Sequence, residues 1–144
     1  MSQTVLITGA SNGIGKACAR VFARKGYDLV LVARHREKLE AVKAELSEYD
    51  VQIKVIAMDL TGEDAAVDLY NDLVLDDISI DILVNNAGFG DHGAFHDSSW
   101  EKQKKMVLLN IVALMQMTYV FGQSMKRRKK GRILNVACNA GSCA

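Results

Sequence analysis

The sequence has 144 residues, of which 49% are hydrophobic and 24% are charged, with a formal net charge of +1. This composition is ordinary for one globular domain and gives no support for a nucleic-acid or acidic-membrane partner. No apolar run approaches the ~18–20 residues of a membrane span, and no signal peptide precedes the first strand-like run. The three cysteines are typical of cytosolic thiols. We therefore expect a cytoplasmic protein without a membrane partner.

Five apolar, strand-like runs alternate with four segments of helical periodicity. Strands are expected at 4–8, 28–33, 51–58, 81–84 and 132–137, and helices at 14–25, 37–48, from 61 onwards and 98–129. Capping-box patterns predict that the third helix starts at Thr61 and the fourth at Ser98. Continuous apolar strands separated by helices indicate a parallel sheet with both faces covered. We expect a doubly wound, Rossmann-like α/β domain with strand order 3-2-1-4-5.

The first strand runs into a glycine-rich turn at residues 9–15, which opens directly into the first helix. Strand, glycine loop and helix together place backbone N–H groups and a positive helix end against a bound phosphate. Gly9 would allow the tight turn, Gly13 the approach of a pyrophosphate and Gly15 the close packing of helix on strand. An ordinary glycine-rich turn is the alternative, but the strand before and the helix after favour dinucleotide binding.

Three further polar or glycine-bearing segments follow other strands, at 33–34, 59–60 and 86–88. Because ligands of open α/β sheets bind beyond the carboxyl ends of the strands, we expect these segments to meet the glycine-rich turn at one edge. Four segments converging there are harder to explain by chance than any one of them. The sequence therefore predicts a single dinucleotide-binding domain over residues 1–144.

These segments resemble the motifs of the classical short-chain dehydrogenase/reductase family. Residues 8–15 (TGASNGIG) match its T-G-x-x-x-G-x-G motif, residues 85–88 match its N-N-A-G motif, and the resemblance spans the whole chain. It implies a Rossmann-like fold that lacks the family's C-terminal strands and helices, since known members are about a hundred residues longer. It also implies cofactor contacts at Gly9, Ser11, Asn12, Gly13, Ile14, Gly15, Arg34, Asp59, Leu60, Asn86, Ala87 and Gly88.

The end of the second strand indicates which nicotinamide cofactor is bound. NAD-binding domains carry an acidic residue there for the ribose 2′-hydroxyl, whereas this chain has Ala33 followed by Arg34. A guanidinium can bind a 2′-phosphate through two parallel hydrogen bonds. By resemblance to the NADP-preferring branch of the family we expect Arg34 to clamp that phosphate, with His35 as a minor candidate. A solvated start of the second helix is the alternative reading.

The resemblance implies hydride transfer between NADP(H) and a small carbonyl or alcohol substrate. Asn110 matches the family's catalytic Asn, while Cys138 stands at the position of its Ser, where a thiol is the weaker hydrogen-bond donor. None of the four tyrosines is followed by Lys four residues later, so the family's Tyr and Lys are absent. We expect little turnover from these residues alone. A non-catalytic NADP-binding module, a pseudoenzyme subunit or a fragment that binds nothing well are the alternatives.

Other features favour structural roles. The basic run 126–130 closes a helix, where positive charge suits the helix dipole, so we expect no nucleic-acid site there. The cysteines lack zinc-ligand spacing, and no metal is expected. His92 and His96 fit a solvated loop better than a substrate contact. A fifth strand at the sheet edge and an apolar fourth helix predict exposed surfaces and hence a homo-oligomer.

Overall fold

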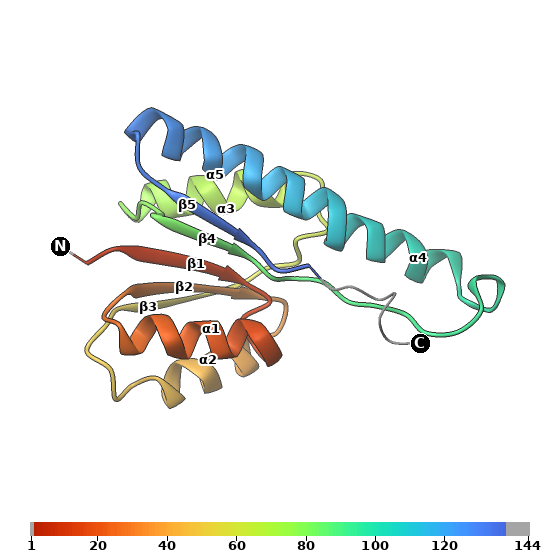
Figure 1. Cartoon of the computed structure of the whole chain (residues 1–144), viewed down its shortest axis with the longest axis horizontal. Helices are drawn as coiled ribbons and strands as arrows, with labels where there is room; N and C mark the ends of the chain where they lie inside the picture. The colour runs from red at the N-terminus through yellow and green to blue at the C-terminus, as the bar shows by residue number, and fades with distance from the viewer. Residues whose placement is uncertain (1, 138–144) are drawn as a thin grey trace.

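The computed structural model describes residues 2–137, which form a five-stranded parallel sheet flanked by helices (Figure 1). The strand order β3-β2-β1-β4-β5 confirms the prediction from sequence. The strands are β1 (Thr4–Thr8), β2 (Asp28–Ala33), β3 (Ile53–Ala57), β4 (Ile82–Asn85) and β5 (Arg132–Asn135). The first two have the predicted bounds, and the other three are shorter or shifted by one or two residues at an end. The switch in direction of the strand order falls between β1 and β4, where a ligand site is expected.

The central strands are apolar on both sides because each side of the sheet packs against helices. Helices α1 (Gly13–Arg24) and α2 (Arg36–Glu45) cover one face, where Ile7 and Leu31 of the strands meet Ala19 and Leu39 of the helices. Helices α3 (Ala65–Leu75) and α5 (Leu114–Arg128) cover the other face. Figure 1 shows these two helical layers on opposite sides of the sheet. This arrangement is the doubly wound α/β fold that continuous apolar strands predict.

The segment expected as one α-helix over 98–129 is interrupted. It consists of α4 (Trp100–Val107), a π-helical turn η2 (Leu108–Ala113) and α5, preceded by a short 3₁₀ turn η1 (Phe95–Asp97). A π turn inserts one residue into an α-helix and is frequently found at functional sites. Here it contains Asn110, the residue that the resemblance marks as catalytic. Helical periodicity alone did not reveal this extra residue.

Both predicted capping boxes are displaced. Helix α3 begins at Ala65 rather than after Thr61, because the Asp59 carboxylate accepts hydrogen bonds from the Thr61 N–H (3.0 Å) and hydroxyl (2.7 Å) and holds a turn there. Helix α4 is capped by Ser99, whose hydroxyl accepts the Lys102 N–H at 3.2 Å. Ser98, the predicted cap, instead donates to Asp91. In both places a nearby aspartate offers a competing partner to the expected cap.

The helical segment is more continuously apolar than expected from sequence. By length and composition alone, the 29-residue helix Trp100–Arg128 is long enough and apolar enough to cross a membrane, so the expectation of no such segment was wrong by that measure. Four of its residues, Ala113, Met117, Phe121 and Met125, are buried in the core against the sheet, and 17% of its most apolar stretch is buried. A helix that packs against a sheet can have the same length and composition. A membrane span therefore does not follow from these two properties.

Candidate functional site

The turn between β1 and α1 presents backbone donors that have no partner within residues 2–137. Gly9 and Gly13 have φ values of +62° and +53°, the left-handed region that glycine adopts without strain. Asn12 precedes the helix with an extended backbone, its side chain makes no capping bond, and the first turn of α1 holds no acidic residue. The N–H groups of residues 13–15 therefore have no acceptor among the described residues, and the positive end of α1 is open to an anion.

The loop after β4 is hydrogen-bonded to this glycine-rich turn. The hydroxyl oxygen of Thr8 accepts the N–H groups of Asn86 and Ala87, each at 2.9 Å. The side-chain amide of Asn86 donates to the carbonyl of Gly9 at 3.1 Å. A Cβ at Gly15 would lie 2.2 Å from that same carbonyl oxygen, so helix α1 packs here only with glycine. Two segments more than seventy residues apart in sequence thus form one surface beside the end of α1.

Arg34 and Asp59 lie near each other on the opposite side of the turn, beyond β2 and β3. The pKa of Asp59 is lowered first by the two hydrogen bonds from Thr61; partial burial opposes this, and the positive charges of Arg34 and Lys105 add to the lowering. Leu60, predicted to contact the cofactor, is buried and packs into the core beneath α3. The sequence-predicted convergence of the segments after β2 and β3 is therefore present in the structure.

Asn110 holds the loop that follows the N-N-A-G sequence. Its Oδ1 accepts the N–H of Phe89 at 3.0 Å, and its Nδ2 donates to the carbonyl of Phe89 at 2.8 Å. A Cβ at Gly88 would lie 2.8 Å from Asn110 Oδ1, so this contact also requires glycine. Both polar groups of the Asn110 amide are engaged by backbone. In this arrangement the side chain holds the start of the loop in place.

The remaining predicted residues are placed less closely. Ser11 is half-buried in the glycine-rich turn, and Ile14 is exposed at the start of α1. Cys138 lies outside the described residues. His92 and His96 are exposed in the loop before α4, and within residues 2–137 no cluster of three or more potential metal ligands occurs. The core of the site is therefore the turn 9–15 with the segments around Arg34, Asp59 and Asn86.

Two groups of residues were missed by the sequence-based reading. Thr8 was recognised only as part of a motif. Its hydroxyl oxygen in fact joins the loop after β1 to the loop after β4. The buried amide of Asn85 donates to Thr118 Oγ1 at 3.1 Å and to Asn135 Oδ1 at 3.0 Å, which ties β4, α5 and β5 together. Polar residues inside otherwise apolar strands were the available signal, because buried polar groups require partners.

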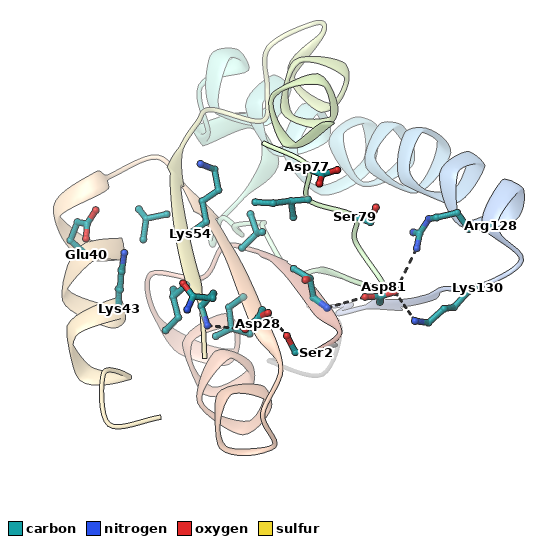
Figure 2. Close-up of a pocket in the computed structure, with 17 residues that line it drawn as sticks. Ser2, Asp28, Glu40, Lys43, Lys54, Asp77, Ser79, Asp81, Arg128 and Lys130 are labelled. Atoms are coloured by element: carbon teal, nitrogen blue, oxygen red, sulfur yellow. Dashed lines mark hydrogen bonds and ion pairs between the residues drawn. The ribbon is translucent and has the colours of Figure 1, made fainter. Parts of the chain in front are cut away.

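A cavity of about 970 Å³ lies at the opposite edge of the sheet, around the amino ends of the strands (Figure 2). None of the predicted cofactor residues lines it. The main polar group in it is the Asp81 carboxylate. This carboxylate accepts the Thr4 N–H at 2.9 Å and forms ion pairs with Lys130 at 3.2 Å and Arg128 at 3.5 Å. Every buried side-chain polar atom in the described part of the chain has a hydrogen-bond partner. We therefore interpret the polar contacts at this edge as structural.

A parallel α/β sheet with an open helix N-terminus at its switch point, framed by glycines, defines a dinucleotide-binding protein. The sequence model of the family described as "short chain dehydrogenase" matches residues 3–144. The chain belongs to this family of oxidoreductases.

Individual relatives agree with this assignment. A very-long-chain 3-oxoacyl-CoA reductase from Bos taurus is 32% identical over 148 residues, covering 98% of this chain and 46% of the relative. A metagenomic short-chain oxidoreductase in complex with NADP is 34% identical with a TM-score of 0.91, covering 98% of this chain and 65% of that one. A Sphingobium yanoikuyae short-chain dehydrogenase in complex with NADPH is 37% identical with a TM-score of 0.88, covering 97% and 55%. The chain thus spans less than half the length of the curated relative.

Proposed function

We propose that residues 1–144 form the dinucleotide-binding domain of an NADP(H)-dependent oxidoreductase that transfers hydride between the nicotinamide and a carbonyl or alcohol substrate. The observation that carries this proposal is the set of N–H groups at residues 13–15, which have no acceptor in the described part of the chain and lie beside Gly9 and Asn86. Such donors fit a pyrophosphate, and a Cβ placed at Gly13 would meet nothing within 4 Å, so the helix end is accessible there. The solved relatives that hold NADP and NADPH support the same cofactor.

Preference for the phosphorylated cofactor is assigned to Arg34. No carboxylate follows β2 to accept a ribose 2′-hydroxyl, and the Arg34 charge already acts on Asp59 in the segment beyond the neighbouring strand. A guanidinium beside the adenosine ribose would bind a 2′-phosphate through charge-assisted hydrogen bonds. The alternative is that Arg34 is simply solvated at the start of α2.

A cofactor titration distinguishes the two interpretations of Arg34. NADPH and NADH are titrated into the wild-type chain, into Arg34→Ala and into Arg24→Ala, which removes an exposed arginine at the far end of α1. We expect the wild type to prefer NADPH and Arg34→Ala to lose about 10- to 100-fold in NADPH affinity, since a charged hydrogen bond contributes about 1.5–3 kcal/mol. Arg24→Ala should keep the preference. Equal affinity of the wild type for both cofactors, or tighter NADH binding, would refute the assignment.

Catalysis by these residues alone is expected to be weak. The sequence holds no Tyr-x-x-x-Lys pair to supply a general acid with a lowered pKa, and the loss of a general acid costs about 10²–10⁴-fold in rate. Both polar groups of the Asn110 amide bond to the Phe89 backbone, which gives this side chain a positioning role in the loop. Measuring NADPH consumption with a panel of ketones tests whether the chain is catalytically active. A chain that binds NADPH without turnover fits the alternative function, a non-catalytic NADP-binding module.

We also propose self-association, because an edge strand of the sheet and an apolar face of the helical segment are exposed. All four residues of β5 are exposed at the edge of the sheet. One side of α4, η2 and α5 carries an exposed apolar stripe of Val107, Ile111, Val112, Met115 and Tyr119. Surfaces of this kind mark protein–protein contacts or self-association. Sedimentation velocity over a range of concentrations should show dimers or larger species, and a single monomer peak at high concentration would contradict the proposal.

A further inference from the structure

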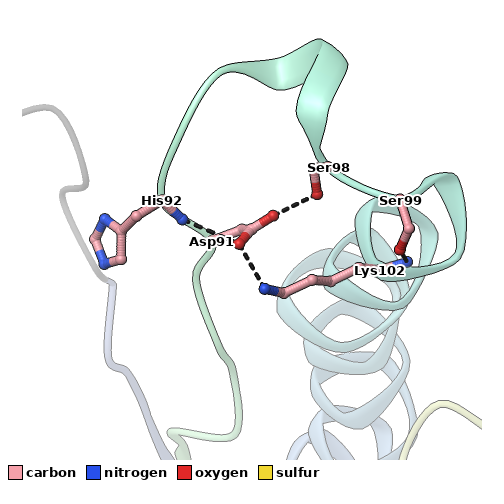
Figure 3. A network of polar contacts seen from close by, with 5 residues as sticks. All are labelled: Asp91, His92, Ser98, Ser99 and Lys102. Carbon is pink, nitrogen blue, oxygen red and sulfur yellow. Dashed lines mark hydrogen bonds and ion pairs between the residues drawn. The ribbon is translucent and has the colours of Figure 1, made fainter.

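The loop between β4 and α4 is fastened to a single helical segment at two places. At its start, Phe89 is held by both polar groups of Asn110 in η2. At its middle, Asp91 reaches the start of α4, where its Oδ1 accepts the Lys102 ammonium group at 2.5 Å (Figure 3). The second contact lies outside every motif of the sequence, and the function described so far assigns it no role.

The Asp91 carboxylate collects three donors. Besides Lys102, it accepts the hydroxyl of Ser98 and the N–H of His92 at 3.1 Å, and only 15% of its side chain is exposed. Figure 3 shows His92, Ser98 and Lys102 around the Asp91 carboxylate, from the loop itself and from the start of α4. Lys102 lies in the first turn of α4, where a positive charge opposes the helix dipole, and the carboxylate compensates for this placement. Asp91, Ser98 and Lys102 are called the loop clasp below.

The three clasp residues belong to the β4 side of the proposed cofactor site, although Lys105, further along α4, acts on Asp59 on the other side. Arg34 and Asp59 follow β2 and β3, on the adenine side of the switch point, whereas the clasp continues the segment 86–88 that follows β4. A dinucleotide across the switch point places its nicotinamide half beyond β4. A loosened clasp would therefore disturb Gly88 and Phe89 but leave the adenine half unchanged.

We propose that Asp91 is a positioning residue for the nicotinamide half of the cofactor, which it holds in place through the loop clasp without touching the cofactor itself. The inference rests on the proposed NADP(H)-binding function. It assigns Asp91 a role in preorganisation, because the loop must occupy its bound position before the nicotinamide half can bind without further ordering cost. If the loop occupies its bound position for only a fraction of the time, the apparent affinity for NADPH is the intrinsic affinity multiplied by that fraction.

Calorimetric titrations with two ligands test this role. NADPH contacts both halves of the site, whereas adenosine 2′,5′-bisphosphate contains only the adenine half. For Asp91→Asn we expect about threefold to tenfold weaker NADPH binding and unchanged bisphosphate binding, which corresponds to a loop in place for roughly a tenth to a third of the time. Asp97→Asn is the matched control, because this carboxylate lies in the same loop and makes no hydrogen bond or ion pair within the described residues. It should change neither affinity.

A spectroscopic readout follows the loop directly. Trp100, the one tryptophan of the sequence, is exposed at the first position of α4, two residues before Lys102. Its fluorescence anisotropy should fall in Asp91→Asn and stay at the wild-type value in Asp97→Asn. Asp91→Glu, which keeps the charge, should restore part of the NADPH affinity. Lys102→Met opens the clasp from the helix side and replaces Asp91→Asn if that variant does not fold.

The outcomes separate the two proposals. Unchanged NADPH affinity in both Asp91→Asn and Lys102→Met would overturn the positioning role, as would an equal loss for NADPH and the bisphosphate, which indicates general loosening of the domain. If the wild-type chain binds neither ligand, the proposed function fails first and the positioning role fails with it. Selective loss of NADPH affinity with lowered Trp100 anisotropy supports the role of Asp91.

Discussion

Replacing Gly15 with alanine gives a direct test of how the cofactor turn is built. A Cβ at this position would lie 2.2 Å from the carbonyl oxygen of Gly9 and 2.5 Å from Nδ2 of Asn86, whereas ordinary contacts begin at 3.4 Å. The nearer atom belongs to the backbone, so it moves only if the turn moves with it. Helix α1 or the turn must therefore shift by roughly 1 Å, and the hydrogen bond between Asn86 and Gly9 is strained by that shift.

Two effects of opposite sign decide the magnitude. Alanine is favoured over glycine inside a helix by about 0.5–1 kcal/mol, while forcing a methyl group into packed space costs about 1–3 kcal/mol. For Gly15→Ala we expect a net loss of about 1–2 kcal/mol in the free energy of unfolding. Cofactor affinity should fall further than stability, because the displaced carbonyl and amide border the phosphate site. Urea unfolding and NADPH titration measure the two losses separately.

Gly122→Ala is the matched control for this substitution. Gly122 also lies within a helix, but a Cβ there would meet only Cδ1 of Ile133, at 3.8 Å. We expect a gain of about 0.5–1 kcal/mol from helix propensity alone and no change in NADPH affinity. If Gly15→Ala were as stable as Gly122→Ala and bound NADPH equally well, the argument from close packing at the glycine-rich turn would be wrong.

Two further substitutions probe the two edges of the sheet. Thr8→Val keeps the shape but leaves the N–H groups of Asn86 and Ala87 without their acceptor; we expect a loss of about 2–3 kcal/mol in urea unfolding, and recovery in Thr8→Ser would confirm the cause. Burial raises the pKa of Asp81, but the Thr4 N–H and the cationic neighbours outweigh it and lower the pKa below the ordinary value of an aspartate. Asp81 therefore stabilises the fold above that value and loses this contribution as the pH falls through its folded pKa. In a profile of the free energy of unfolding against pH, Asp81→Asn should reduce the loss of stability at acidic pH. An unchanged loss would contradict this assignment.

The fold follows from the sequence because its main signals are local. Each strand is an apolar run that ends in glycine or a polar residue, and each helix has a periodic apolar face, so order and topology need no knowledge of distant contacts. The convergence of the glycine-rich turn with Arg34, Asp59 and Asn86 follows in the same way, since parallel strands bring their carboxyl ends to one edge. Element ends were less predictable, as the displaced helix starts near Thr61 and Ser98 show.

The polar contacts that shape the site depend instead on the register of segments far apart in the sequence. Asn110 reaches Phe89 from within a π turn, whose extra residue rotates every later side chain relative to an ideal helix. Asp91 competes for Ser98, which shifts the start of α4 by one residue and leaves Ser99 as the cap. A one-residue error in either place would aim these side chains at solvent. Sequence patterns therefore located the site, while the contacts that hold its loops in place required the three-dimensional arrangement of β4, α4 and η2.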